Sequence, residues 1–363
     1  MDEASWALNL LERSVQLPSV SGSEAEAVGE LVAYLKDAGM HAWQDDAHNL
    51  VVDAGDAPPS LYVLGHIDTV AGHVPVEQRD GQLYGRGTVD AKGPLMAAIA
   101  GLKRLDPAVL RQTGIRVIGA VGEEAPGSVG AHHAVRTMQP PDWLVIAEPS
   151  GWDRVALGYK GLVRADVATA RASEHSAGPN PSASDRLVEY LSSVRQALLA
   201  WNAEGARLFD SVQPSILKLS HTHDGLEEHA SARVGVRLPP DCDPQEVADV
   251  FKQQAPAHGV EVRILEALPA VRSPADGALQ RAFRGAIRAQ GGRPGRSVKT
   301  GTSDWNVVRR VWDVPTLAYG PGDSSLDHTP NEHVAVDEFE RAVRVWQAVY
   351  VAMVEHLTGK PTQ

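Results

Sequence analysis

Residues 61–68 read Leu61-Tyr-Val-Leu-Gly-His-Ile-Asp68, a short apolar run that ends in two potential metal ligands. An uninterrupted apolar run of this length is typical of a parallel strand buried on both faces. Two further runs follow the same plan: Ile115 to Val121 leads into Gly122-Glu123-Glu124, and Trp143 to Ala147 leads into Glu148. Because open α/β sheets place their sites at the carboxyl ends of parallel strands, the three runs predict one shared site.

Helical patterns alternate with these runs. Ser21-Gly-Ser-Glu opens the first with capping-type residues, and others cover Gly93 to Leu105, Leu279 to Gln290 and Val336 to about His356. This alternation predicts an α/β fold with a mixed central sheet flanked by helices. In the middle of the chain the order changes to β-α-β-β-α-β, which predicts a ferredoxin-like α+β insert. We expect a discontinuous catalytic domain at 1–157 and 272–363, and an inserted domain at 158–271.

Composition narrows the classes of partner and compartment. The 363 residues include 46 Asp and Glu against 34 Lys and Arg, a formal net charge of -12, which argues against a nucleic acid or an anionic membrane as partner. The single Cys242 rules out an intramolecular disulfide, and no apolar run approaches the roughly 18 residues of a membrane span. The first residues carry no signal-peptide pattern. We expect a cytoplasmic protein.

Two more potential ligands lie outside the three strand ends. Asp90 closes the stretch Gly85-Arg-Gly-Thr-Val-Asp90 directly before a predicted helix, and its glycines let the backbone turn sharply. That stretch lacks the third glycine of a dinucleotide-binding loop. His328 lies in a turn-rich loop after the last predicted strand. Together with His66 and the acids, these residues form the ligand set for one or two Zn²⁺-like ions, which turn bound water into a nucleophile near neutral pH.

Such chemistry also needs a general base that is not itself a metal ligand. Glu123 and Glu124 can divide the two roles, because adjacent side chains in extended backbone point in opposite directions. His66 and Asp68 are two residues apart and point the same way, so the Asp68 side chain is placed to orient the imidazole. A serine hydrolase has little support, because no Gly-x-Ser-x-Gly elbow is present.

Six motifs along the chain are similar, in sequence and in order, to those of one enzyme superfamily. They are Gly65-His66-Ile-Asp68, Gly85-Arg-Gly-Thr-Val-Asp90-Ala-Lys-Gly, Gly122-Glu123-Glu124, Ala147-Glu148-Pro, Arg171-Ala-Ser-Glu-His175-Ser and His328-Thr-Pro-Asn-Glu332. With these motifs the chain resembles the metal-dependent aminoacylase and carboxypeptidase (M20) superfamily, which includes acetylornithine deacetylase, succinyl-diaminopimelate desuccinylase and the glutamate carboxypeptidases. The resemblance implies a di-zinc peptidase-like amide hydrolase, whose inserted domain is a lid that also dimerises.

The resemblance also implies a role for each of these residues. Asp90 would bridge two divalent ions, Zn²⁺ or alternatively Co²⁺. His66 and Glu148 would complete one metal site, and Glu124 and His328 the other. The proposed catalytic residues are Glu123 as proton acceptor, Asp68 as the supporting acid, and His175, which would reach the partner subunit's active site in a homodimer and stabilise the oxyanion.

Within the superfamily, the chain is most similar to the LysK-type hydrolases. The similarity lies in Thr88-Val-Asp-Ala-Lys-Gly-Pro, Leu157-Gly-Tyr-Lys-Gly and Lys299-Thr-Gly-Thr-Ser-Asp-Trp. It implies release of lysine or ornithine from the C-terminal glutamate of the small amino-group carrier protein LysW, in lysine and arginine biosynthesis. The alternatives are acetylornithine deacetylase, succinyl-diaminopimelate desuccinylase or dipeptidase activity and, outside enzymes, a non-catalytic binding protein, although every ligand and the base are retained.

Substrate contacts are expected from three positions that match the family: Arg237, Gly301 and Thr302. An exposed arginine of the insert is the competing interpretation of Arg237. An acidic carrier protein is an unexpected partner for a chain of net negative charge. We therefore expect a positive rim around the cleft, built from Arg86, Lys92, Lys160, Arg164 and Lys299.

Overall fold

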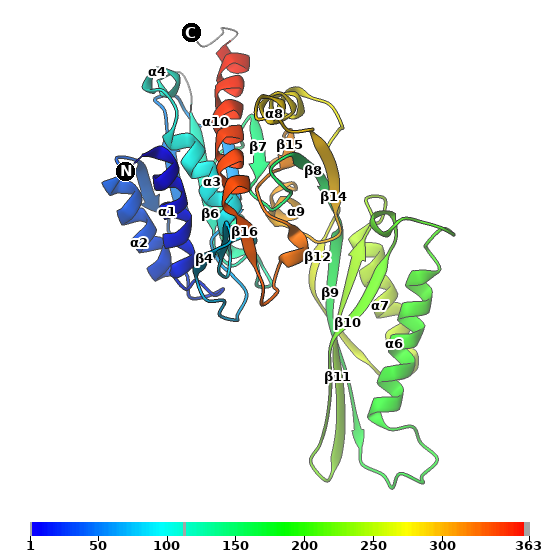
Figure 1. Ribbon diagram of the computed structural model, residues 1–363. Helices are drawn as coiled ribbons and strands as arrows, with labels where there is room; N and C mark the ends of the chain where they lie inside the picture. The colour runs from blue at the N-terminus through cyan, green and yellow to red at the C-terminus, as the bar shows by residue number, and fades with distance from the viewer. Residues whose placement is uncertain (1, 112–113, 359–363) are drawn as a thin grey trace. The chain divides into compact units, whose positions relative to one another are not determined.

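A computed structural model of the chain describes residues 2–111 and 114–358 (Figure 1). The chain forms two compact units. Unit 2 comprises Tyr159–Arg272 together with Lys299–Asn306, and unit 1 comprises the rest of the described chain. The later segment groups with unit 2 because Asn306 ties it there, donating from Nδ2 to the carbonyls of Lys160 at 3.0 Å and Pro269 at 2.8 Å.

Unit 1 is built on a mixed sheet, as the sequence predicts. The central strands run parallel in the order β6-β3-β7-β15, and antiparallel strands extend the sheet on both sides. In spatial order the strands are β1 (His41–Gln44), β2 (Leu50–Ala54), β6 (Ile115–Ala120), β3 (Leu61–His66), β7 (Trp143–Ile146), β15 (Thr316–Ala318) and β8 (Arg154–Tyr159), with β14 (Gly295–Lys299) also pairing with β8.

The register of the parallel strands brings their carboxyl ends to one edge. His66 of β3 pairs with Ala120 of β6, and Leu64 pairs with Ile146 of β7. All six residues of β3 are buried, which confirms the interpretation of the apolar run. A Cβ on Gly65 would lie 2.9 Å from the Ala147 Cβ, so only glycine lets the chains approach this closely.

Helices cover this sheet, and α3 is the most deeply buried of them. It packs against α1, α10 and β3, and a Cβ on Gly101 would lie 2.6 Å from the Trp346 Cβ of α10. The predicted helices at 93–105, 279–290 and 336–356 are confirmed. The helices of this unit are α1 (Glu3–Gln16), α2 (Ala25–Asp37), α3 (Lys92–Lys103), α4 (Pro107–Leu110), α5 (Val129–Thr137), α8 (Ala278–Ala289), α10 (Val336–Thr358) and the 3₁₀ turn Ser324–Leu326.

Unit 1 also contains a small second sheet, which the sequence analysis did not predict. Its strands are β4 (Glu77–Arg79), β5 (Gln82–Tyr84) and β16 (His333–Ala335), in the order β16-β5-β4. Each has three residues, too few for an alternating pattern to be recognised in sequence. This sheet matters for the site because β5 leads into the Gly85–Asp90 loop, and β16 follows directly after Glu332.

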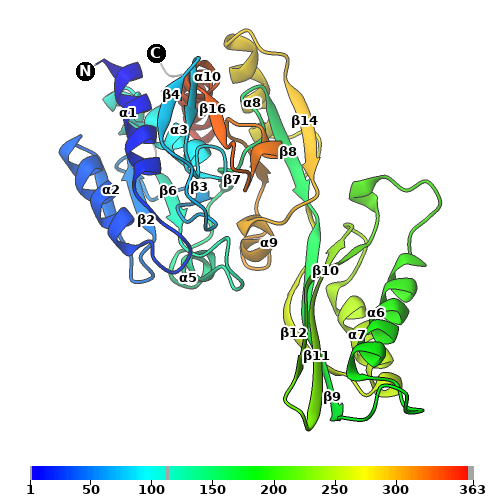
Figure 2. The same ribbon diagram turned by 60° about the horizontal axis from the view of Figure 1, so that its bottom comes forward.

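Unit 2 has the predicted β-α-β-β-α-β order. Its antiparallel sheet has the spatial order β10-β11-β9-β12, and α6 and α7 pack on one face around a core that includes Tyr190 and Phe251 (Figures 1 and 2). A capping box of Ser182 and Asp185 starts α6. The elements are β9 (Gly161–Ala172), α6 (Ala183–Leu199), the 3₁₀ turn Leu208–Asp210, β10 (Gln213–His223), β11 (Glu227–Leu238), α7 (Pro244–His258), β12 (Glu261–Leu268), β13 (Val271–Arg272) and the start of α9 (Asp304–Val308).

Within the described ranges, no helix is both long enough and apolar enough to span a lipid bilayer.

Candidate metal centre

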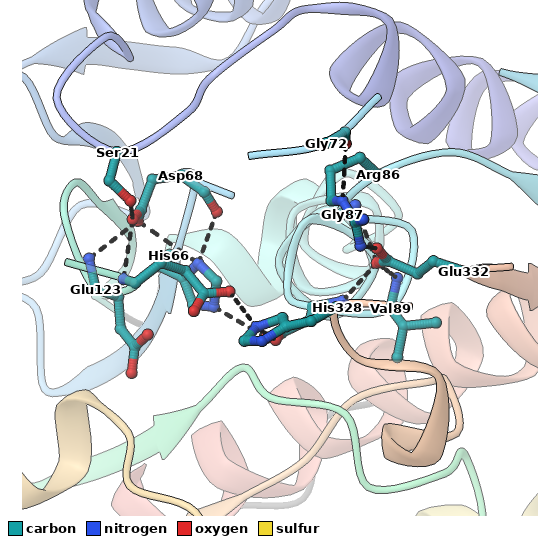
Figure 3. Close-up of polar contacts among 12 residues, drawn as sticks. Ser21, His66, Asp68, Gly72, Arg86, Gly87, Val89, Glu123, His328 and Glu332 are labelled. Atoms are coloured by element: carbon teal, nitrogen blue, oxygen red, sulfur yellow. Dashed lines mark hydrogen bonds and ion pairs between the residues drawn. The ribbon is translucent and has the colours of Figure 1, made fainter. Parts of the chain in front are cut away.

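Side chains from four separate segments of unit 1 meet at the carboxyl edge of the sheet. His66 ends β3, Asp90 lies just before α3, Glu124 follows β6, and His328 comes from the loop after β15. The Asp90 carboxylate lies between the imidazoles, with Oδ1 3.2 Å from His66 Nε2 and Oδ2 3.0 Å from His328 Nε2. Figure 3 shows the two histidine side chains converging.

The remaining predicted ligands join this pair on either side. Glu124 Oε1 lies 2.7 Å from His328 Nε2, and Glu148 Oε1 lies 3.7 Å from His66 Nε2. Ligand atoms of His66, Asp90 and Glu124 all fall within 4.8 Å of one another. The five side chains therefore form two groups that share Asp90, one with His66 and Glu148 and the other with Glu124 and His328.

The electrostatics of this cluster favour a bound cation. Burial raises the pKa of Glu148 well above its ordinary value. Burial alone would also raise the pKa of Asp90, but hydrogen bonds from His328 and His66 outweigh it and hold the pKa well below its usual range. The contacts with Asp90 and Glu124 raise the pKa of His328 to about 10. Three carboxylates that converge with little access to water need a positive partner, and imidazole nitrogen with carboxylate oxygen is a donor set that suits Zn²⁺.

The Asp68 side chain organises the backbone next to this cluster. It is fully buried, and its Oδ2 accepts hydrogen bonds from Ser21 Oγ at 2.7 Å and the Glu124 N–H at 3.0 Å. Its Oδ1 accepts from the Glu123 N–H at 3.1 Å. One carboxylate thus fixes the segment that carries both glutamates, and Figure 3 shows Ser21 and Glu123 around it.

The orientation of His66 differs in detail from the sequence-based expectation. Its Nδ1 donates to the main-chain carbonyl of Asp68 at 2.9 Å, whereas the Asp68 Oδ1 lies 3.6 Å away. Burial would lower the pKa of His66, but its contacts with Asp68 and Asp90 raise it well above the ordinary value. The bond from Nδ1 leaves Nε2 directed at Asp90 and available as a ligand.

The two adjacent glutamates diverge, although not for the reason that the sequence suggested. Residues 123–125 form a bend rather than a strand, and Gly122 has a φ of 72°. The Glu124 carboxylate reaches His328, while the half-buried Glu123 side chain points away from Asp68 (Figure 3). Glu123 therefore lies beside the ligand cluster without belonging to the group of close donors.

The other predicted site residues belong to unit 2. Arg237 Nη1 donates to Thr302 Oγ1 at 2.8 Å, so two of the expected substrate contacts touch each other, and the adjacent Gly301 is half-buried. His175 lies in the loop between β9 and α6, exposed, with Nδ1 accepting from the Ala177 N–H at 3.1 Å.

Two of the five cations expected at a positive rim are buried instead, so the expectation is wrong for Lys92 and Lys160. Lys92 Nζ donates to the carbonyls of Ser14 and Leu17, both at 2.8 Å, at the end of α1. Lys160 Nζ donates to the Leu208 carbonyl and to Gln213 Oε1, both at 2.8 Å. Burial lowers the pKa of Lys92 to about 7 and that of Lys160 to about 8.

The other three expected rim residues are partly exposed. Arg86 pairs with Glu332 at 2.7 Å, Arg164 pairs with Glu266 at 3.3 Å, and Lys299 is half-buried. A cation whose partner lies within hydrogen-bond distance offers less net charge to an approaching protein. For these three side chains the positive rim stays a prediction.

Two residues have structural roles that the sequence patterns do not indicate. The pattern predicts a helix-capping role for Ser21, but α2 begins at Ala25 and the Ser21 hydroxyl binds Asp68 instead. Glu332 ends the motif that begins at His328, and the resemblance assigned no role to it. The structure shows that Glu332 is fully buried and that its carboxylate contacts the loop that carries Asp90. Burial raises the pKa of Glu332, which its hydrogen bonds oppose.

With the geometry established, comparison with known proteins gives the family. The model of peptidase family M20/M25/M40 matches residues 62–352. The chain belongs to this family. Its members among the curated relatives are hydrolases, and the His66, Asp90 and Glu124 cluster fits the use of divalent metal ions.

Members of the family that resemble this chain over nearly its full length carry related names. The [LysW]-lysine hydrolase of Deinococcus radiodurans is 42% identical, over 97% of this chain and 98% of that protein. A putative [LysW]-lysine/[LysW]-ornithine hydrolase of Thermococcus kodakarensis is 32% identical, over 97% and 92%. Among solved structures, an M20 family metallo-carboxypeptidase from Sulfolobus solfataricus superimposes with a TM-score of 0.78 at 18% identity, covering 96% of this chain and 99% of that one, which supports the fold.

Proposed function

We propose that this family member hydrolyses the amide that links lysine, or ornithine, to the γ-carboxyl of the C-terminal glutamate of an amino-group carrier protein of the LysW type. The observation that carries this proposal is the 42% identity, end to end, with a [LysW]-lysine hydrolase. The activity would serve lysine and arginine biosynthesis in the cytoplasm. A lone thiol supports that location, since Cys242 forms no intramolecular disulfide.

Two divalent ions, Zn²⁺ in our proposal with Co²⁺ as the alternative, would be held by the five ligands described above. His66, Asp90 and Glu148 would hold one, and Asp90, Glu124 and His328 the other. When bound, such ions lower the pKa of water and polarise the scissile carbonyl. The shared Asp90 supports this assignment, because its two oxygens face different histidines.

The proton transfers are assigned to Glu123. Its carboxylate lies beside the ligands, where it would accept a proton from water and deliver it to the departing amine nitrogen. Asp68 supports the reaction by fixing the Glu123 and Glu124 amides. His175 is proposed to stabilise the oxyanion, from the same subunit or its partner.

Recognition of the substrate is assigned to Arg237, Gly301 and Thr302. The Arg237 guanidinium donates to Thr302, and the planar fork of a guanidinium suits a planar carboxylate. The amino acid that leaves in this reaction carries a free carboxylate. Arg237 would therefore bind the end of the substrate that becomes free lysine or ornithine.

A homodimer is proposed through the open edge of the unit 2 sheet. β10 is an edge strand, and it exposes Ile216, Leu217 and Leu219, each more than half accessible. Unpaired edges with exposed apolar residues favour pairing with another strand. Sedimentation analysis of an Ile216→Glu and Leu219→Glu double variant should give a monomer where the wild type gives a dimer.

A side-by-side assay tests the substrate. Carrier-linked γ-glutamyl-lysine, its ornithine analogue and N-acetylornithine are each incubated with the protein, with Zn²⁺ or Co²⁺ and with a chelator. A Glu123→Ala variant serves as the control for contaminating hydrolases. We expect metal-dependent release of lysine or ornithine from the carrier; hydrolysis of N-acetylornithine alone would reject the proposed substrate in favour of a deacetylase.

A further inference from the structure

Glu332 is a fully buried carboxylate with four hydrogen-bond donors around it. Its Oε1 accepts from three backbone N–H groups, those of Gly87 at 2.9 Å, Val89 at 3.0 Å and Asp90 at 3.1 Å. Its Oε2 accepts from Arg86 Nη1 at 2.7 Å. Figure 3 shows Arg86, Gly87 and Val89 gathered around Glu332. All of these residues are in unit 1, so their arrangement does not depend on where unit 2 lies.

The Glu332 carboxylate binds the backbone of the loop that connects β5 to α3 at three positions. Gly87 in this loop has a φ of 91°, a conformation that side-chain-bearing residues rarely adopt. Backbone amides that are buried without an acceptor are costly, and one carboxylate oxygen here accepts three of them. The N–H of Asp90 is one of the three, so the bond reaches the shared metal ligand itself.

The same carboxylate also links the loop to the second histidine of the centre. His328 and Glu332 belong to one short segment that precedes β16, and the Gly85 N–H donates to the Glu332 carbonyl at 3.3 Å. Asp90 and His328 come from segments far apart in the chain, yet their side chains lie 3.0 Å from each other. The Glu332 side chain therefore joins the loop that carries Asp90 to the segment that carries His328.

We propose that Glu332 is a positioning residue of the metal centre: by holding the Asp90 backbone against the His328 segment, it sets the affinity for the divalent ion that Asp90 and His328 share. This role rests on the proposed metal ligands but not on the identity of the amide substrate. Arg86 acts with it by binding the other carboxylate oxygen. Residues that orient ligands in this way typically account for about ten- to hundredfold in metal affinity.

The test measures metal binding in the absence of substrate. Apo full-length protein is titrated with Zn²⁺ in competition with a chromogenic chelator, for the wild type, Glu332→Gln and Glu340→Gln. Glu340 is the matched control, since it also binds an arginine, Arg104, with both oxygens at 2.8 and 3.0 Å, and it lies on α10. The glutamine side chain in Glu332→Gln keeps one acceptor oxygen, but its N–H₂ group must face either Arg86 or the backbone amides, which are themselves donors. We expect it to weaken binding of at least one ion by about 10- to 100-fold.

The control separates positioning from a general loss of stability. Glu340→Gln is expected to keep the wild-type affinity even where its thermal midpoint falls as far as that of Glu332→Gln. Wild-type affinity for both ions in a folded Glu332→Gln protein would overturn the proposal. If Glu332→Gln does not fold, Arg86→Gln takes its place, because this variant keeps all three backbone hydrogen bonds to Glu332. We expect Arg86→Gln to lower the Zn²⁺ affinity by at least about threefold. An unchanged affinity in that variant would also overturn the proposal. These Zn²⁺ affinities are measured without substrate, so a negative result in the carrier-protein assay would reject the proposed substrate without changing the expected affinities.

Discussion

Replacing Asp68 with asparagine should disturb the structure and the chemistry together, by an amount that its contacts define. The carboxylate accepts three hydrogen bonds, two from backbone amides and one from Ser21. An asparagine has one oxygen, and its N–H₂ must face either the Glu123 N–H or the Glu124 N–H. The Ser21 hydroxyl can rotate to accept, but an amide cannot.

The expected cost follows from these contacts. One buried N–H left without an acceptor costs about 1–3 kcal/mol, and the two remaining bonds lose their charge assistance at about 0.5–1 kcal/mol each. We therefore expect Asp68→Asn to lower the free energy of unfolding by about 3 kcal/mol. Because the released segment carries both Glu123 and Glu124, displacement of about 1 Å should also reduce kcat/KM by about a hundredfold.

Urea unfolding of the apo protein in chelator, followed by circular dichroism, isolates the protein's own contribution from that of bound metal. Ser21→Ala is the matched control: it removes one donor but leaves the carboxylate on both amides, and it should cost about 1 kcal/mol with kcat nearly unchanged. A free energy of unfolding for Asp68→Asn within about 0.5 kcal/mol of the Ser21→Ala value, with wild-type kcat/KM, would refute this account.

Three further outcomes are expected. Glu123→Gln should keep the metal affinity measured by competition titration and reduce kcat by at least about a hundredfold, and wild-type turnover would remove Glu123 from the mechanism. Zn²⁺ at about 100 times its Kd should stabilise the apo protein by about 2.7 kcal/mol for each site filled, as measured by thermal unfolding, whereas an Asp90→Ala variant should respond much less. Hydrogen bonds from Arg233 lower the pKa of Asp166 to about 2, with Arg263 adding to the effect, so its stabilisation is complete above about pH 5 and is lost as the pH falls below about 4. The free energies of unfolding of the wild type and of Asp166→Asn, measured in urea, should therefore converge as the pH is lowered. A difference between them that does not change with pH would contradict this.

Sequence patterns predicted the parts of this molecule that depend on local residue order. The apolar runs at β3, β6 and β7 gave buried parallel strands, and the ligands at their ends followed from the way such sheets place their sites. The β-α-β-β-α-β order of unit 2 followed from the alternation of its strands and helices. Helix α1 was missed even though Asp2 caps it and Leu10, Leu11 and Val15 line its buried face.

Features that depend on distant contacts were out of reach. Lys92 and Lys160 were expected at the surface because a charged side chain usually stays hydrated, but each is enclosed by carbonyl acceptors from other segments. The role of Glu332 depends on a loop 245 positions earlier in the chain. A single sequence carries no signal for either, since burial of a charge is decided by which acceptors the fold brings to it.

The position of β15 in the sheet has a consequence for synthesis of the protein. β15 lies between β7 and β8, yet it is encoded far downstream of both, after the whole of Tyr159–Arg272. At translation rates of about 5–20 residues per second, the edges of β7 and β8 wait on the order of 10–30 s for their partner. During that interval, the contiguous segment Tyr159–Arg272 of unit 2 can fold, while the half-built sheet offers open backbone to any neighbouring chain. His328 emerges later still, so a nascent chain acquires its full set of ligands only after β15 has been made.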